Sequence, residues 1–197
     1  YNGSMTYTGD GYSGVLFYGL QFEAGAASSL IATVDSAVTR AADSASVDLT
    51  QAGFNGGPFS IVSETEGGQG VYPRAWTLTD GTLDNRLTVY RNSGTATTST
   101  NWFYYGASEG SAQVSSSVTG SASAGKLAVS YDTNDVSFCA SGGSVTNDTS
   151  AVIPKNITTL IFGSQANGTA NKLNGHIKRL ALYSEPLSDS NLQALTS

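Results

Sequence analysis

The stretch KLAVSYDTNDVSFCASGG, residues 126–143, decides the class of fold. Apolar side chains occupy every second position on both sides of a tight Thr133-Asn134 turn, and a strand sends alternate side chains to opposite faces of a sheet. The pattern predicts an antiparallel hairpin with one face on an apolar core. The residues of that face are Leu127, Val129, Tyr131, Val136, Phe138 and Ala140.

Short runs of the same β type recur along the chain at intervals of about ten to fifteen residues. Turn signals such as Asp80-Gly81 and Asn174-Gly175 separate them. Regular spacing of this kind is typical of an all-β sandwich or barrel. We predict an exposed strand within the Ser-rich region 107–125 and strands over 14–23, 60–66, 74–79, 86–91, 101–106, 126–132, 135–140, 158–164 and 176–183.

The stretch NGHIKRLALYSEPLSDSNLQAL, residues 174–195, contains the single histidine of the chain, His176. Strict alternation predicts that His176 and Lys178 share one face of a strand with Leu180 and Leu182. Acid–base chemistry needs partners that orient the imidazole ring, and no carboxylate lies near in sequence. We therefore predict a structural role for His176.

The end of the chain predicts one short helix, from about 189 to 195. Pro186 ends the preceding extended run, and Ser188 is a suitable N-cap residue. Leu192 and Leu195 are expected to fold back onto the body of the domain.

Composition excludes several classes of partner. The net charge is −6, with 9 Lys and Arg and no basic run, which argues against nucleic acid or an anionic membrane as partner. No apolar run approaches the roughly eighteen residues of a membrane span. Cys139 is the one cysteine, so it forms no internal disulfide, and we predict that it is a small strand residue.

The first 35 residues differ from the rest of the chain in composition. They hold a dense aromatic run and one or two strands, too few to enclose a core. We predict that residues 1–35 are the terminal strand or strands and connector of an upstream module, and that 36–197 form one sandwich, the main body of which begins near Ala45. The absence of Met at position 1 favours a piece of a longer polypeptide, and 36–197 is expected to fold without 1–35.

Residues 18–43, YGLQFEAGAASSLIATVDSAVTRAAD, resemble a junction common in bacteriophage tail and virion proteins, in which a Gly-x-Gln-x-Glu-x-Gly strand precedes a VTRAAD connector. The positions that match are Gly19, Gln21, Glu23 and Gly25. The remainder resembles a concanavalin A-like (laminin-G-like) lectin/glucanase domain. That likeness is carried by LTDGTLDNRLTVYR (78–91), by the hairpin and by LNGHIKRLALYSEPLSDSNLQALTS (173–197).

The resemblance implies an all-β, antiparallel, two-sheet concanavalin A-like sandwich of the jelly-roll type with a short C-terminal helix. It also implies a non-catalytic virion module, in a tail fibre, spike or decoration, that adheres outside the cell to host-surface polysaccharide. Its partners would be that glycan and other virion proteins, as a homo-oligomer with a trimer preferred. A polysaccharide depolymerase on the same fold and a purely structural decoration module are the alternatives.

Two groups of residues are candidates for sugar binding. The run TNWFYYG predicts Trp102 and Tyr104 on one face of a strand and Phe103 with Tyr105 on the other. One pair fills the core, while the other can stack on the C–H face of a sugar. We select Trp102 and Tyr104 as that platform, and we expect Trp76 in the core.

The loop TDGTLDNR supplies the second group. Asp84, Asn85 and Arg86 carry groups that hydrogen-bond sugar hydroxyls. Asp80 and Asp84 are also a possible calcium site, since calcium takes converging oxygen ligands. An ordinary turn is the competing interpretation, because Asp-Gly is itself a turn signal. No other cofactor is expected.

Glu64 and Glu66 form the one candidate acid pair for hydrolysis. They lie two residues apart on a predicted strand, about 6 to 7 Å along one face, near the separations that glycosidases use. The third acidic residue that glucanases of this fold carry is missing. We therefore predict that both carboxylates are solvated surface groups and that the chain is not an enzyme.

Overall fold

The computed structural model describes residues 43–197 apart from 55, 68–71, 92–100, 109, 120–123, 153 and 169, together with positions 10–12, 14, 30, 32 and 36. Within the strands, the side chains of 101–105, 107, 113–119 and 124 are outside that description. The chain divides into two units, Tyr1–Ala41 and Ala42–Ser197, and both sheets belong to the second. The predicted strand over 14–23 and the junction residues Gly19, Gln21, Glu23 and Gly25 lie outside the described residues.

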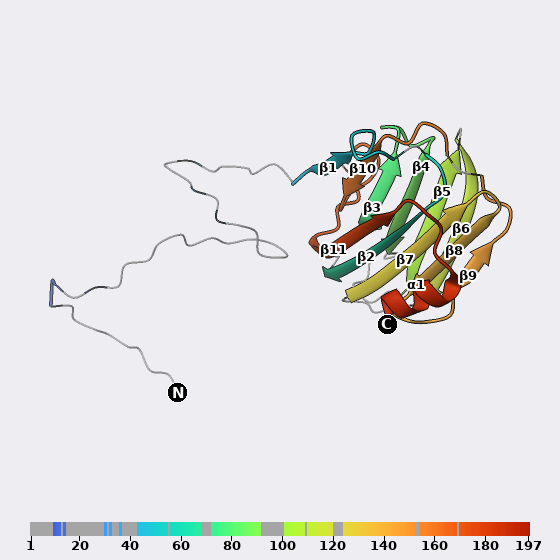
Figure 1. Cartoon of the computed structure of the whole chain (residues 1–197). Helices are drawn as coiled ribbons and strands as arrows, with labels where there is room; N and C mark the ends of the chain where they lie inside the picture. The colour runs from blue at the N-terminus through green and yellow to red at the C-terminus, as the bar shows by residue number, and fades with distance from the viewer. Residues whose placement is uncertain are drawn as a thin grey trace. The chain divides into compact units, whose positions relative to one another are not determined.

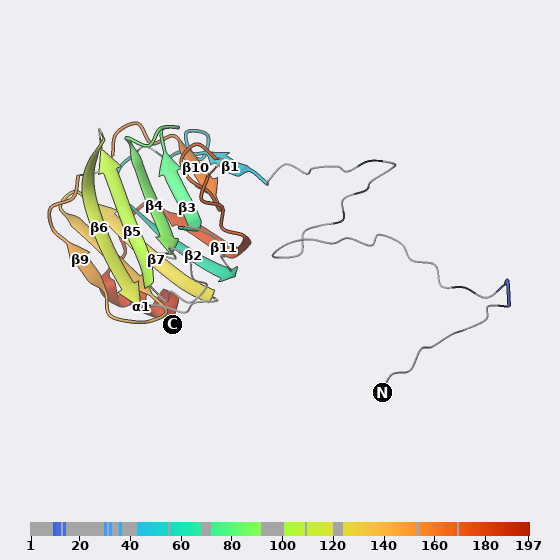
Figure 2. The same cartoon turned by 180° about the vertical axis from the view of Figure 1, so that it is seen from behind.

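The second unit is a sandwich of two antiparallel sheets (Figure 1), which confirms the predicted class of fold. The six-stranded sheet, which faces the viewer in Figure 2, has the order β1 (Ala45–Asp48), β10 (Thr159–Phe162), β3 (Arg74–Thr79), β4 (Arg86–Arg91), β5 (Asn101–Ser108), β6 (Ser111–Thr119). The five-stranded sheet has the order β11 (Gly175–Tyr183), β2 (Phe59–Gly67), β7 (Ala124–Asp132), β8 (Asp135–Ala140), β9 (Thr146–Asp148). Every pair of neighbouring strands is antiparallel.

The predicted hairpin is the pair β7 and β8. Val129 lies opposite Phe138, and Tyr131 lies opposite Val136. All four side chains are buried in the core between the sheets. Asn134 closes the turn with a φ of 58°, a conformation that asparagine tolerates better than most residues.

The core joins the two sheets through apolar packing and through a buried polar contact of Trp76. Trp76 on β3 is 1% exposed, and its indole Nε1–H donates to the Oγ of Ser63 on β2 at 3.2 Å. Phe59 and Tyr131 stack with ring centroids 5.6 Å apart. The predicted core position of Trp76 is confirmed.

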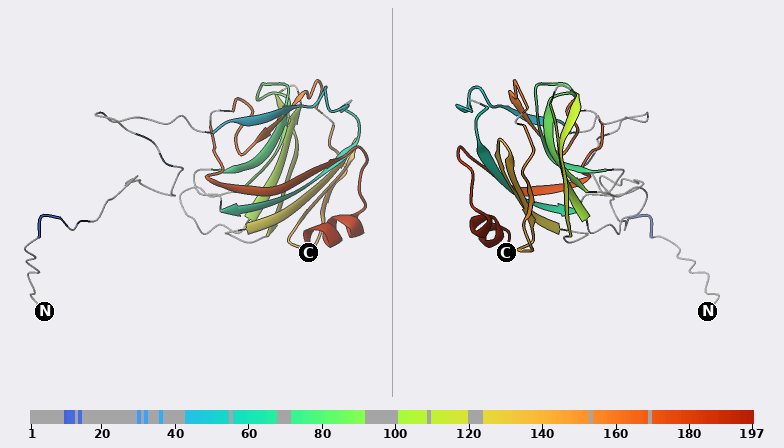
Figure 3. Two further views of the ribbon diagram at one scale, coloured as in Figure 1. Left: turned by 60° about the vertical axis from the view of Figure 1, so that its left-hand side comes forward. Right: turned by 90° about the vertical axis from the view of Figure 1, so that its right-hand side faces the viewer.

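The predicted helix is α1 (Asp189–Thr196), which begins at the N-cap Ser188. The helix lies on the outer side of the five-stranded sheet (Figure 3), where Leu192 packs with Val62, Ala128 and Cys139. No helix of the described residues is long and apolar enough to cross a membrane.

The prediction that Leu195 folds back onto the body is wrong, because Leu195 is 37% exposed. Thr196 is buried instead, and its hydroxyl donates to the carbonyl of Leu192 at 2.8 Å. Leu192 and Thr196 are four residues apart and share the buried stripe of the helix, while Leu195 lies at its margin.

The prediction that His176, Lys178, Leu180 and Leu182 share one face of β11 is correct for the two leucines and wrong for His176 and Lys178. Leu180 and Leu182 share one face, as predicted, and that face packs on the core. Ile177 pairs with Thr65 while Arg179 pairs with Glu64, so Lys178 is the extra residue of a β-bulge. The bulge reverses the alternation and places His176 opposite Glu66, on the outer face of the sheet.

The sequence pattern does not predict the short strands β1 and β9, but it does predict β6. β1 and β9 have four and three residues, too few to show a period of two. β6 confirms the strand predicted within the Ser-rich region 107–125.

We predict that Ser63→Ala lowers the free energy of unfolding by about 1 to 3 kcal/mol, since the buried indole N–H of Trp76 loses its acceptor. Urea denaturation followed by tryptophan fluorescence measures the change. Ser46→Ala on the exposed strand β1 is the matched control and is expected to stay within about 0.5 kcal/mol of the wild type. Equal effects of the two substitutions would show that the Trp76–Ser63 bond adds nothing.

Candidate functional site

The outer faces of the two sheets are covered to different extents. On the five-stranded sheet, α1 covers part of β2, β7 and β8. On the six-stranded sheet, the loop 163–173 lies over part of β3, where the Oγ1 of Thr77 donates to the carbonyl of Ser164 at 2.8 Å. The same loop also contacts the start of β3, where the amide of Arg74 donates to the carbonyl of Asn171 at 3.1 Å.

Beside this loop lie two tyrosines and an arginine, which we call the Tyr–Arg cluster: Tyr72, Arg74 and Tyr90. The guanidinium carbon of Arg74 lies 4.2 Å from the ring centroid of Tyr90, a cation–π contact. The rings of Tyr72 and Tyr90 meet edge to face, with centroids 6.2 Å apart. Tyr72 is 41% exposed, while Arg74 and Tyr90 are half-buried.

A β-bulge builds the cluster. Arg74 pairs with Tyr90 while Trp76 pairs with Val89, so Ala75 is an extra residue on β3. Without the bulge, alternation would send Arg74 to the same face as Trp76, into the core. With the bulge, Arg74 lies beside Tyr90 on the outer face.

The backbone at Tyr72 is strained. Its φ of 49° lies in the left-handed region, which is a genuine outlier for a bulky residue. Such a conformation costs on the order of 1 to 3 kcal/mol and persists where the surroundings hold it. Here the amide of Arg91 donates to the carbonyl of Pro73 at 3.0 Å, directly after Tyr72.

The Tyr–Arg cluster offers the chemistry of a polar, partly flat ligand. An exposed aromatic ring stacks on the apolar face of a sugar, and its hydroxyl reaches a neighbouring polar group. A guanidinium donates hydrogen bonds to hydroxyls or a carboxylate, and in Arg74 the Nε and Nη1 atoms are buried. Because the guanidinium already contacts the Tyr90 ring, less conformational freedom is lost when a ligand binds.

The loop predicted as a sugar or calcium site lies at the other end of the β3–β4 hairpin, roughly 16 Å from the cluster at about 3.3 Å per residue. Its groups bond mainly to one another. One oxygen of Asp80 accepts from the amide and the hydroxyl of Thr82 at 2.8 and 2.6 Å, and the other accepts from the Nδ2 of Asn85 at 2.9 Å. Arg86 donates to the carbonyl of Leu83.

These bonds set the charge state of Asp80. Partial burial alone would raise the pKa of this carboxyl, but the hydrogen bonds from Thr82 and Asn85 outweigh it and lower the pKa. Within the described ranges no three His, Cys, Asp or Glu side chains gather as metal ligands. Calcium at Asp80 and Asp84 stays a prediction, and both oxygens of Asp80 already accept hydrogen bonds.

The predicted sugar platform, Trp102 and Tyr104, lies on β5. Trp102 pairs with Arg91 and Tyr104 pairs with Val89, and both of these partners are buried. The side chains of residues 101–105 are outside the described part of the structure. Sugar binding by Trp102, Tyr104, Asp84, Asn85 and Arg86 therefore stays a prediction.

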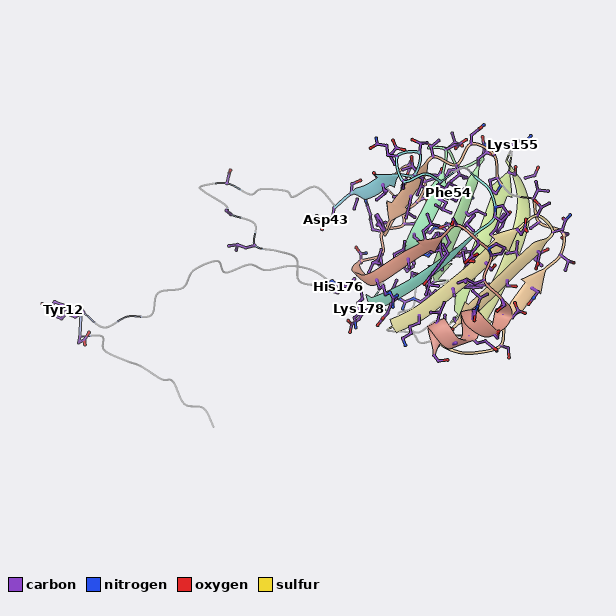
Figure 4. The ribbon with its side chains drawn as sticks, in the orientation of Figure 1. Tyr12, Asp43, Phe54, Lys155, His176 and Lys178 are labelled. Carbon is purple, nitrogen blue, oxygen red and sulfur yellow. The ribbon has the colours of Figure 1, made fainter. Side chains whose placement is uncertain are left out.

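The candidate acid pair lies on the outer face of β2, opposite β11. Glu66 forms an ion pair with Lys178, with Oε2 and Nζ 2.9 Å apart and both side chains about half exposed. The hydrogen bond and charge of Lys178 lower the pKa of Glu66, and a general acid needs a raised one. Figure 4 shows His176 and Lys178 side by side at the same end of the sheet.

Sequence reasoning missed the Tyr–Arg cluster. Tyr72 stands directly before Pro73, and this pairing at the start of a strand is the signal that the sequence offers. The partnership of Arg74 with Tyr90 follows from a strand register that includes the bulge, which no local pattern encodes.

No family model and no curated protein sequence matches this chain. Among solved structures, the CBM40 domain of the Ruminococcus gnavus IT-sialidase is similar, with a TM-score of 0.63, 14% identity and coverage of 78% of this chain and 93% of that one. The same domain bound to alpha2,6 sialyllactose has a TM-score of 0.61 and 18% identity, with coverage of 78% of this chain and 93% of that one. A third similar structure is domain 4 of AbnA, a GH43 extracellular arabinanase from Geobacillus stearothermophilus, in complex with arabinotriose. Its TM-score is 0.50 and its identity 15%, with coverage of 71% of this chain and 66% of that one.

The similarity to these solved structures defines the class of fold to which the chain belongs. Identities of 14 to 18% show the fold alone, and that fold is the jelly-roll β-sandwich found in carbohydrate-binding domains. The two Ruminococcus gnavus structures are CBM40 domains of a sialidase, and the third was solved with arabinotriose. What this particular chain binds is a separate question that depends on its own surface residues.

We predict that Asp80→Asn flattens the acid dependence of stability. The pKa of Asp80 is lowered in the folded state, so its contribution is present above the unfolded value and is lost as the pH falls through the folded one. Below about pH 4 the wild type should therefore lose stability more steeply than the variant. Urea unfolding at a series of pH values measures both slopes, and parallel slopes would contradict the assignment.

We predict that His176→Gln leaves ligand binding within a few-fold and costs at most about 1 kcal/mol of stability. His176 is exposed at the start of an edge strand of the five-stranded sheet, whereas the Tyr–Arg cluster belongs to the six-stranded sheet. Isothermal titration and chemical denaturation measure the two effects. A folded variant that lost a polysaccharide-cleaving activity would show instead that the imidazole is catalytic.

Proposed function

We propose that the Tyr–Arg cluster on the six-stranded sheet binds a glycan. The observation that carries this proposal is a partly exposed tyrosine held in a strained backbone conformation beside a second tyrosine whose ring fixes an arginine. The exposed ring of Tyr72 supplies the stacking surface, while Tyr90 and Arg74 border it with polar groups.

Two features support a sugar as the ligand. The fold is shared with domains solved with sialyllactose and with arabinotriose. The cluster also combines apolar rings with a planar hydrogen-bond donor, the combination that sugars require.

We infer that the binding is non-catalytic. The lowered pKa of Glu66 and its ion pair with Lys178 speak against general acid catalysis at the one acid pair predicted from the sequence. A depolymerase on the same fold is the second candidate, favoured by the spacing of Glu64 and Glu66 on one strand.

For the biological setting we propose a bacteriophage virion module that adheres to host-surface glycans outside the cell. The support is the resemblance of residues 18–43 to virion junctions, through Gly19, Gln21, Glu23 and Gly25. Single sugar sites bind weakly, so a homo-oligomer of this module, with a trimer preferred and other virion proteins as neighbours, would raise avidity.

The test is a glycan array probed with the whole chain, followed by titration of the best glycan into single variants. We predict that Tyr72→Ala, Tyr90→Ala and Arg74→Gln each weaken binding at least tenfold, about 1.4 kcal/mol. Tyr12→Ala, at a tyrosine outside the sandwich that is 97% exposed, is the matched control and should leave binding unchanged.

Two further variants separate the candidate surfaces. Loss of binding in Trp102→Ala or Arg86→Gln, with full binding in the cluster variants, would move the site to the surface predicted from the sequence. Circular dichroism on each sample checks that the fold persists. Release of reducing ends from any bound polysaccharide would establish the depolymerase instead.

A further inference from the structure

The four edge strands of the sandwich differ in how they are protected against pairing with another chain. An exposed edge presents unpaired N–H and C=O groups, and proteins guard such edges with short strands, bulges or charges. β1 and β9 are short. β11 is long but has the bulge at Lys178, beside the charged side chain of Arg179.

β6 is the exception among these four strands. It is nine residues long, SAQVSSSVT, with no charged residue and no proline. The bulge in its pairing with β5 falls at Gln113, which leaves a regular ladder from Val114 to Thr119. No strand of the described residues pairs with the other side of β6.

The regular part of β6 is also self-complementary. Residues 114–118 read VSSSV, a palindrome centred on Ser116. When two copies of this segment pair antiparallel about Ser116, Val114 meets Val118 of the partner copy and Ser115 meets Ser117. Valine then lies opposite valine and serine opposite serine, with no like charges to repel, and β-branched pairs of this kind stabilise antiparallel strands.

We propose that β6 pairs with β6 of a second copy about a two-fold axis through Ser116, so that the two six-stranded sheets become one continuous sheet. A two-fold contact is isologous, since the same segment serves both copies. The pairing is independent of glycan binding. It is also distinct from the three-fold association expected of a fibre, because its symmetry is two-fold.

The pairing has a geometric consequence for the candidate site. Strands joined antiparallel in one sheet keep the same face of that sheet on the same side. The Tyr–Arg clusters of both copies therefore face the same way, and a surface that displays many glycans can engage both.

Light scattering on the whole 197-residue chain tests the proposal. The expected mass is twice the 20.2 kDa of one chain. Ser115→Lys combined with Ser117→Lys places like charges opposite each other across the axis and should raise the dimer dissociation constant at least tenfold. The control, Ser46→Lys combined with Ser184→Lys, adds the same charge at exposed positions away from β6 and should stay dimeric.

A cross-link locates the axis. Opposite Cα atoms in an antiparallel pair are about 4.5 to 5.5 Å apart, within the range of a disulfide. Oxidised Ser116→Cys should therefore run as a covalent dimer, whereas the wild type should not, because Cys139 is buried. A wild-type monomer at every concentration, an oligomer unaffected by the lysine pair, or a dimer that Ser116→Cys cannot cross-link would each overturn the proposal.

Discussion

The sandwich depends on the closure of its two sheets around Trp76. The indole ring fills the space between β3 and β2, and its N–H reaches Ser63 on the opposite sheet. A buried N–H without an acceptor is costly, so this bond favours one relative placement of the sheets over others that would bury the same apolar area. Once Trp76 is fixed, the neighbouring residues of β3 are fixed too: Thr77 faces outward to the loop 163–173.

The same strand carries the candidate site just before Trp76, and its bulge separates a core residue from a surface residue. Trp76 takes the inner face, while Arg74, two residues earlier, takes the outer one. Bulges are frequent beside binding sites because they redirect single side chains without disturbing the rest of the sheet. The site thus lies directly beside the buried residue Trp76, which limits the conformational entropy that is lost when a ligand binds.

Much of the fold could be predicted from the sequence, because a strand between two layers shows its period of two directly. The faces of β7 and β8 follow from their alternating apolar residues, and Ser188 marks the start of α1. Side chains do not alternate strictly between the two faces of a strand where a bulge adds a residue, as at Lys178 and at Ala75. A bulge is decided by the neighbouring strand, so the local pattern does not contain it, and both the position of His176 and the Tyr–Arg cluster escaped the prediction for that reason. The loop around Asp80 shows the opposite case, since its residues were noticed for their charge but bond mainly to one another.

The burial of Cys139 beneath α1 gives the chain a reporter of its own local motions. The thiol lies on the outer face of β8 and is buried, with its sulfur 3.3 Å from the hydroxyl of Thr196 on the helix and 3.4 Å from the carbonyl oxygen of Gly143. A reagent in solution reaches this sulfur when the last helix lifts from the sheet, an opening that need not involve the core between the sheets. The rate of thiol modification therefore measures how often the helix detaches, while the tryptophan between the sheets reports on the sandwich itself. Two natural side chains thus distinguish fraying of the C-terminal helix from global unfolding without any added label.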